Sequence, residues 1–314
     1  MLKTVFFGTP DAAVPFLEQL NALTQVALVV TKPDSPAGRG LRLQPCPVKK
    51  RALELGLPVI SPEIFKDSVA QIAALKADFG FAVAYGKIFK KPALEAFKHG
   101  IINIHFSLLP KYRGAAPIQQ ALFDGQTKTG VSAFWIDEGL DTGLLAAQTA
   151  IDILPQDDEI SLFDKLTRAA QADFAGIVKD LEAGRITKTP QKGEPSFAPV
   201  IDKKDTVVNF RTMTAAKINN LTRGLAGGIP AYAKAQTPKG ETVQLLKTTL
   251  KPMPQAPKLH PGAFIAVERG IGFFVQCLEG VLFIETLRPA GKNKMPAWDY
   301  YNGKKPQAGD IMFL

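Results

Sequence analysis

Residues 79–105 read FGFAVAYGKIFKKPALEAFKHGIINIH, and the order of the patterns in this stretch decides the fold class. The apolar run Phe79–Ala84 is broken at Tyr85–Gly86, which predicts a buried strand followed by a turn. Pro92–Lys98 carries a proline where a helix begins, and Ile101–Ile104 is a second apolar run. Strand, helix and strand in this order predict one repeating unit of a parallel sheet.

The same alternation extends in both directions from this stretch. Further strands are predicted at Leu2–Phe7, Val26–Val30, Leu57–Ile60 and Val131–Ile136, and helices at Asp11–Leu23, Val48–Leu55, Ser68–Lys76, Pro117–Phe123 and Asp158–Glu182. Residues 31–47 hold four prolines and two glycines, which indicates a long loop. We therefore expect an α/β fold with a doubly wound, mostly parallel, Rossmann-like sheet.

The last third of the chain differs in charge and in pattern. Residues 203–314 hold 16 Lys and Arg against 7 Asp and Glu, so they carry the whole net charge of +9 and residues 1–202 are neutral. Such an excess indicates either a solvated basic surface or attraction to a polyanion such as nucleic acid. Its predicted elements are one helix and a series of short strands: Ala215–Leu225, then Val243–Lys247, Gly262–Val267, Gly272–Gln276 and Val281–Leu287. Short strands of this kind suit a small OB-like β-barrel.

These patterns divide the chain at a segment rich in proline and lysine. We predict a first domain at 1–189, a linker at 190–205 and a smaller, basic, OB-like domain at 206–314. The sequence holds no exposed apolar repeat and no coiled-coil pattern, so a monomer is expected.

Composition excludes several classes of protein. No apolar run approaches the length of about 18 residues that a membrane span needs, and the start MLKTVFFGTPD is too short for a secretory core. Cys46 and Cys277 give no disulfide framework, which favours a reducing cytoplasm. The histidines His99, His105 and His260 show no spacing typical of metal ligands, so no metal is expected.

Polar residues gather where two predicted strands end. Asn103 and His105 lie two positions apart and face the same side of a strand, and WIDEGLDTG at 135–143 supplies Asp141. The aspartates there could simply form turns. If the three residues meet, Asn could donate to an oxyanion, His could shuttle a proton or stabilise charge, and Asp could orient the His, as acyl transfer needs. No G-x-S-x-G is present and Ser107 lies in a predicted turn, so direct transfer to an external amine is favoured over a covalent intermediate.

The first predicted turn between a strand and a helix contains no nucleotide-binding motif. FFGTPDAA at 6–13 lacks both the G-x-G-x-x-G of a dinucleotide site and the G-K-[ST] of a P-loop. NAD and ATP are therefore not expected.

Several motifs together resemble one family. They are N-x-H-x-SLLP at 103–110, RGAAPI at 113–118, D-x-G-L-D-T-G at 137–143, FFGTPDAA at 6–13, TKPDSPAGRG at 31–40, ADFGFAVAYGKIF at 77–89 and SFAPVIDKKD at 196–205. The chain is similar over nearly its whole length to the formyltransferases that use 10-formyltetrahydrofolate, and within them to those whose acceptor is an aminoacyl-tRNA.

The resemblance implies an activity and a set of site residues. It implies that the formyl group passes to the α-amine of methionine on initiator tRNA, for translation initiation, with Asn103, His105 and Asp141 as the catalytic residues. Residues expected to line the folate site are Ser107, Leu108, Leu109 and Pro110, and those whose backbone is expected to hold the pterin are Tyr85, Gly86, Lys87, Ile136, Asp137, Glu138, Gly139 and Leu140.

The expected tRNA contacts are basic residues in two regions. Arg39 stands in the loop that the resemblance assigns to the acceptor arm. The remaining candidates are the basic residues in or after that loop and in the C-terminal part: Arg42, Lys49, Lys50, Lys203, Lys204 and Arg223.

Three alternatives stay open at this point. A formyltransferase acting on a sugar nucleotide would share the catalytic residues and has a small acceptor, so it needs neither the basic loop nor a basic second domain. A glycinamide-ribonucleotide formyltransferase would resemble only the front half. A nucleic-acid-binding module without catalysis would make the grouping of Asn103, His105 and Asp141 incidental.

Overall fold

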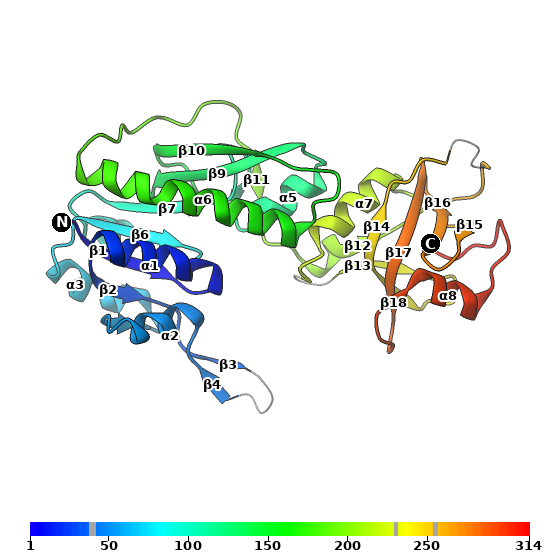
Figure 1. The fold of residues 1–314 in the computed structure, drawn as a ribbon, viewed down its shortest axis with the longest axis horizontal. Helices are drawn as coiled ribbons and strands as arrows, with labels where there is room; N and C mark the ends of the chain where they lie inside the picture. The colour runs from blue at the N-terminus through cyan, green and yellow to red at the C-terminus, as the bar shows by residue number, and fades with distance from the viewer. Residues whose placement is uncertain (38–41, 229–231, 254–256) are drawn as a thin grey trace. The chain divides into compact units, whose positions relative to one another are not determined.

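A computed structural model describes residues 1–37, 42–228, 232–253 and 257–314 of the chain (Figure 1). Contacts divide these residues into two units, each built from separate parts of the sequence. Unit 1 comprises Met1–Gly114, Lys128–Asp152 and Asp164–Phe197, and unit 2 comprises Ala115–Thr127, Ile153–Phe163 and Ala198–Leu314. Short segments of the front half thus belong to unit 2, and the division at a linker of 190–205 stays a prediction.

Unit 1 is built on a seven-stranded sheet. Across the sheet the strands are β5 (Val59–Ile60), β2 (Gln25–Val30), β1 (Lys3–Gly8), β6 (Phe79–Val83), β7 (Ile101–His105), β9 (Lys128–Trp135) and β10 (Leu145–Asp152). The first five are parallel to one another, whereas β9 and β10 are antiparallel to their neighbours. From β1 the chain builds outward first to one side and then to the other, so the predicted doubly wound, mostly parallel sheet is confirmed.

Helices cover both faces of this sheet. They are α1 (Val14–Leu23), α2 (Pro47–Glu54), α3 (Val69–Ala74), α4 (Lys91–Leu94) and α6 (Glu159–Glu182), with 3-10 turns at Asp11–Ala13 and Phe65–Ser68. Helices α1 and α6 lie on the same face of the sheet (Figure 1). On this face the ring of Phe174 lies 5.3 Å from that of Phe16 and 5.5 Å from that of Phe81. On the other face, Phe7 and Ile101 pack with side chains of α3 and α4. The central strands are buried on both faces, which explains their continuous apolar runs.

Two segments of unit 1 differ from expectation. The long loop expected at 31–47 contains an antiparallel pair, β3 (Ser35–Ala37) with β4 (Arg42–Gln44). A two-stranded ribbon has only edge strands and so tolerates proline, which made its sequence look like a loop. Strand β10 was not expected, because this edge strand is only partly buried and consists largely of small and polar residues.

Unit 2 contains a second sheet around its own core. The strands run in the order β12 (Val207–Val208), β13 (Ala233–Gln236), β14 (Thr242–Thr249), β17 (Val281–Pro289), β16 (Gly272–Gln276) and β15 (Phe264–Glu268), with β18 (Met295–Pro296) beside β17. All pairs are antiparallel except β12 with β13. Helices α5 (Pro117–Phe123), α7 (Ala215–Gly224) and α8 (Ala297–Lys304) and the 3-10 turn Lys203–Thr206 complete the unit. The predicted β-rich second domain is confirmed, and β13 and α8 were not expected.

Candidate active site

Strand β7 presents Asn103 and His105 on one face of the sheet of unit 1. Asn103 lies opposite Ala82 of β6 and Phe134 of β9, and His105 lies opposite Ser132. The Asn103 carboxamide is half-buried and forms no hydrogen bond with the residues that the structure describes. An amide that has no hydrogen-bond partner among these described residues is available to a bound molecule.

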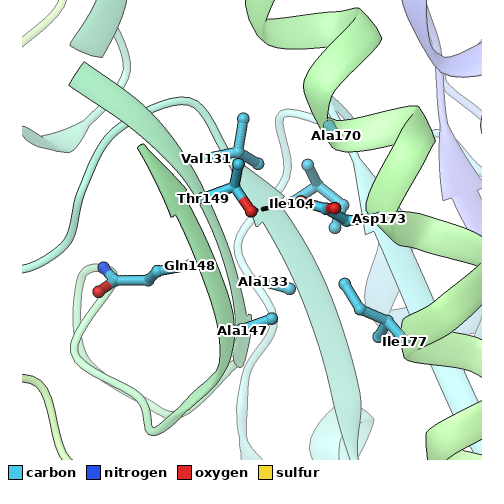
Figure 2. Close-up of a pocket in the computed structure, with 9 residues that line it drawn as sticks. All are labelled: Ile104, Val131, Ala133, Ala147, Gln148, Thr149, Ala170, Asp173 and Ile177. Atoms are coloured by element: carbon cyan, nitrogen blue, oxygen red, sulfur yellow. Dashed lines mark hydrogen bonds between the residues drawn. The ribbon is translucent and has the colours of Figure 1, made fainter. Parts of the chain in front are cut away.

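The opposite face of β7 is closed by helix α6. Ile104 points to that face and lines a small cavity between the sheet and α6 (Figure 2). The other lining residues are Val131, Ala133, Ala147, Gln148, Thr149, Ala170, Asp173 and Ile177. Thr149 donates a hydrogen bond to Asp173 across it. The cavity belongs to the packing of α6, and the polar residues of β7 face away from it.

The imidazole of His105 is buried, with only 7% of the residue exposed. Its Nε2 is 2.9 Å from the main-chain oxygen of Tyr112, and its Nδ1 is 3.8 Å from Oδ2 of Asp141. Burial lowers the pKa of His105 from its ordinary value, against the smaller opposing effects of the Asp141 carboxylate and of the Tyr112 hydrogen bond. Because a carbonyl oxygen can only accept, Nε2 carries the hydrogen of the neutral ring and Nδ1 is left with a lone pair facing Asp141.

Asp141 reaches His105 by an indirect route. Strand β9 is antiparallel to β7, so its last residue, Trp135, pairs with Ile102 near the start of β7. His105, at the end of β7, pairs with Ser132 instead. Residues 136–143 return over the sheet to bring the carboxylate back, and Oδ2 accepts a hydrogen bond of 2.7 Å from the main-chain nitrogen of Gly114. The sequence suggested that the polar residues meet at one edge where two strands end. His105 and Asp141 do come together, but the loop after β9 brings the carboxylate to the imidazole, and the two strands do not end at the same place.

The turn after β7 is fixed by internal hydrogen bonds. Ser107 is fully buried and donates 2.6 Å to the main-chain oxygen of Lys111. Ser132 donates to the oxygen of Ser107 and accepts from the nitrogen of Leu109. With its hydroxyl buried and bonded, Ser107 is not placed as a nucleophile, in agreement with the sequence analysis. Of the predicted folate-lining residues, Leu109 and Pro110 are also buried and Leu108 is half-buried.

The two loops predicted to hold a pterin have unusual backbone. After β6, Ala84 and Gly86 have φ angles of +48° and +69°, and Tyr85 packs inward with its phenol pKa raised by burial to about 12. Lys87 is half-buried and donates to the oxygen of Glu63 over 3.3 Å.

The loop after β9 is held by one aspartate. Asp137 accepts hydrogen bonds from the Gly139 nitrogen at 3.0 Å and the Thr142 hydroxyl at 2.6 Å. Ile136 is half-buried, whereas Asp137, Glu138, Gly139 and Leu140 are exposed. This loop therefore offers main-chain groups to solvent, and the assignment of pterin contacts to it and to Tyr85–Lys87 stays a prediction.

The predicted tRNA-binding residues divide between the two units. In unit 1, Lys49 pairs with Asp34 at 2.7 Å and Lys50 is exposed. Arg42 lies in β4, and Arg39 lies outside the described residues.

In unit 2 the predicted tRNA-binding residues differ in their exposure and in their hydrogen bonds within the protein. Lys203 and Lys204 are exposed in a 3-10 turn. Arg223 donates to the main-chain oxygens of Asp157 at 2.5 Å and Leu154 at 2.9 Å. This arginine therefore serves to hold the turn before α6, and the exposed lysines are the freer candidates.

The structure contains two main-chain contacts that the sequence analysis missed. The oxygen of Tyr112 holds His105, and the nitrogen of Gly114 holds Asp141. Every residue type has a main-chain oxygen, and every type except proline has a main-chain N–H, so the residue identities gave no signal for these contacts. Within the described ranges no group of three or more His, Cys, Asp or Glu side chains is placed to hold a metal, and no helix is long and apolar enough to cross a membrane.

The chain combines an α/β domain with a second, β-rich domain, and its relatives show that this combination belongs to a group-transfer enzyme. Residues 2–177 match the family described as formyl transferase, and residues 200–305 match the formyl transferase C-terminal domain. The chain is 44% identical to the methionyl-tRNA formyltransferase of Elusimicrobium minutum, with 99% of this chain and 100% of that protein covered. It is 41% identical to the methionyl-tRNA formyltransferase of Thermodesulfovibrio yellowstonii, with 97% of both covered. The chain therefore belongs to the methionyl-tRNA formyltransferase family.

A solved structure shares the fold. The N-formyltransferase of Helicobacter canadensis, determined with folinic acid and dTDP-3-aminofucose, matches with a TM-score of 0.70 at 21% identity over 91% of this chain and 99% of that one. At this identity the likeness concerns the fold alone.

Proposed function

We propose that Asn103, His105 and Asp141 carry out the transfer of a formyl group from 10-formyltetrahydrofolate to the α-amine of methionine on initiator tRNA. The observation that carries this proposal is the buried imidazole of His105, whose Nδ1 lies 3.8 Å from the Asp141 carboxylate, beside the free carboxamide of Asn103. The membership of the chain in its family supports the same reaction.

The loops around these residues suit a folate. A pterin presents a flat edge of donors and acceptors, which main-chain groups can match. Exposed main chain at Asp137–Leu140 and the half-exposed Leu108 lie in two loops of the same unit as His105. The folate would supply the formyl group, and the protein would supply binding, orientation and proton transfer.

The reaction requires that a negative charge on the formyl oxygen be stabilised and that one proton be transferred. The amine nitrogen attacks the formyl carbon, a carbon–nitrogen bond forms, and the carbonyl electrons move to oxygen. The Asn103 amide donates to that oxygen, an interaction worth about 2.7–4 kcal/mol in comparable sites. The bond to N10 of the folate then breaks and its electron pair stays on N10, which takes up a proton.

His105 and Asp141 move that proton. In the neutral ring Nδ1 is an acceptor, so it can take the proton that the attacking amine loses. The imidazolium then faces the Asp141 carboxylate and can donate through Nδ1 to the oxyanion or to N10. Burial favours the neutral ring, which can accept the proton, and the Asp141 carboxylate stabilises the imidazolium that results.

The proposed acceptor, a tRNA, is a large polyanion, and the excess of basic residues in the C-terminal part of the chain suits it. Residues 203–314 carry a net charge of +9, and basic side chains attract nucleic-acid phosphates. We propose that Lys49, Lys50, Lys203 and Lys204 contact the tRNA, with Arg39 and Arg42 at the acceptor arm. We further propose that the sheet of unit 2 forms an OB-like barrel, that the chain works as a monomer and that it acts in the cytoplasm, where initiator tRNA is used.

The deciding experiment compares acceptors with one donor. Purified protein is given 10-formyltetrahydrofolate with initiator methionyl-tRNA, elongator methionyl-tRNA or an amino-sugar nucleotide, and formylated product is measured. We expect transfer to the initiator form, and His105→Gln should abolish it. Transfer to the amino sugar alone would assign this chain to the sugar-nucleotide acceptors, whose enzymes share its fold. No transfer to any acceptor would refute the proposal.

A further inference from the structure

The segment 189–196 follows α6 in unit 1, and the sequence analysis placed most of it in a linker. In the structure this segment, called here the docked segment, is bonded to two different loops of the site. Thr189 exchanges two main-chain hydrogen bonds with Leu145, of 2.7 and 3.0 Å. At its other end, Ser196 accepts from the nitrogen of Tyr112 through its hydroxyl at 3.0 Å and from the nitrogen of Arg113 through its carbonyl at 2.9 Å.

Gln191 lies between these two anchors and uses its whole carboxamide. Its Nε2 donates to the main-chain oxygens of Asp141 and Gly143, each at 2.8 Å. Its Oε1 accepts from Nη2 of Arg113 at 2.6 Å. Because the guanidinium only donates, it fixes which side of the amide is the oxygen and so turns the two N–H groups toward the loop.

The two loops that Gln191 joins are those that hold His105 and Asp141. Arg113 lies between Tyr112, whose oxygen accepts from His105, and Gly114, whose nitrogen binds the Asp141 carboxylate. Asp141 itself has a φ angle of +52°, a left-handed conformation that a non-glycine residue keeps only when its surroundings hold it. The bonds from Gln191 to the carbonyls of Asp141 and Gly143 are part of those surroundings.

We propose that Gln191 is a positioning residue, whose carboxamide holds the main chain at Asp141 so that its carboxylate stays beside the imidazole of His105. This inference rests on the proposed function for its effect on catalysis. Its structural part, the placement of Asp141 against His105, can be measured without any turnover.

Two substitutions test the carboxamide. Gln191→Met has similar length and no hydrogen bonds. Gln191→Glu keeps the shape and the contact with Arg113 but has no N–H groups for the two carbonyls. The matched control is Gln276→Met in unit 2, because Gln276 also donates to two main-chain oxygens, those of Cys277 at 2.9 Å and Gly280 at 3.1 Å. Thermal unfolding checks that each variant is folded.

The first readout is the pKa of His105, followed by NMR and assigned with His105→Gln. If the Asp141 carboxylate retreats by about 1 Å from its separation of 3.8 Å, the pKa of His105 in Gln191→Met falls by roughly 0.5–1 unit at an effective dielectric constant of about 20. The control leaves it unchanged.

The second readout is steady-state formylation. Both Gln191 variants should lower kcat on the order of tenfold to a hundredfold, as misplacement by about 1 Å does, with KM for both substrates within about threefold. A folded Gln191→Met variant with the parent His105 pKa would overturn the proposal, whatever its kcat, as would Gln191→Glu with the parent kcat. If the parent protein formylates no methionyl-tRNA, the proposed function fails, and the His105 pKa still decides this inference.

Discussion

Replacement of Asp141 by Asn isolates the charge beside His105. Asparagine tolerates a left-handed backbone, so the φ angle of +52° at this position can persist. Its side-chain oxygen can still accept from the nitrogen of Gly114. The fold and the folate loops should therefore be retained, and only the negative charge is lost.

The size of the effect follows from the distance. Two unit charges 3.8 Å apart attract by about 4 kcal/mol at an effective dielectric constant of about 20. Since about 1.4 kcal/mol corresponds to a factor of ten, an imidazolium formed during the reaction loses up to about a thousandfold of stabilisation. The amide dipole retains part of it, so we expect kcat of Asp141→Asn to fall by roughly a hundredfold to a thousandfold.

The kcat of Asp141→Asn is measured from initial rates of formylation of initiator methionyl-tRNA. KM for both substrates is expected within about threefold of the parent values. The control is Asp152→Asn in the same unit, a carboxylate 74% exposed and 3.9 Å from Lys128. Surface pairs of this kind contribute little, so its kcat should match the parent. A folded Asp141→Asn enzyme with kcat within fivefold of the parent would refute the role of the charge.

Four other outcomes are expected. Asn103→Ala should lower kcat by about a hundredfold or more while the dissociation constant for the folate is kept, and a loss under fivefold would reject the oxyanion role. Because burial lowers the pKa of His105, this residue takes up a proton at a higher pH in the unfolded state than in the folded state. Stability should thus fall as pH drops from about 6.5 toward the pKa of the folded state. Urea unfolding at several pH values should show this slope, and His105→Gln should remove it. A Cβ at Gly143 would lie 1.7 Å from a main-chain oxygen of β9, so Gly143→Ala should displace the loop of Asp141 and cost about 1–3 kcal/mol in unfolding free energy. Gly176→Ala, in open space on α6, should instead stabilise by about 0.5–1 kcal/mol. Arg39→Ala should raise KM for tRNA or lower kcat while folate binding survives, and an unchanged kinetic profile would contradict the role of Arg39.

The buried strands of unit 1 were the most predictable elements. Phe79–Val83 and Ile101–His105 are covered on both faces, so their composition alone marks them. Strand β10 was missed because it lies at an edge and is only partly buried. The pair of strands β3 and β4 was missed because it holds Pro36 and lies in a stretch whose prolines and glycines are typical of a loop. The prediction of strands thus succeeded where burial on both faces requires apolar residues. It failed where a strand is partly exposed and accepts polar residues or proline.

The sequence by itself determined that Asn103 and His105 share one face of a strand. That follows from the two-residue period of extended backbone, which is a local property. It also determined the family, because the chain is 44% identical to a methionyl-tRNA formyltransferase with 99% of its length covered.

Only the tertiary structure decided what surrounds them. Asp141 lies in the loop after β9, whose last residue, Trp135, pairs with Ile102, and this loop brings the carboxylate to His105. Gln191, 50 positions beyond Asp141, lies in a segment with the composition of a linker and yet bonds to that loop. The burial that lowers the pKa of His105 exists only once distant segments are folded together. The carbonyl that sets its tautomer comes from Tyr112, seven residues along the chain, and depends on the turn that follows β7. Contacts of this kind depend on three-dimensional proximity, which the order of residues does not express.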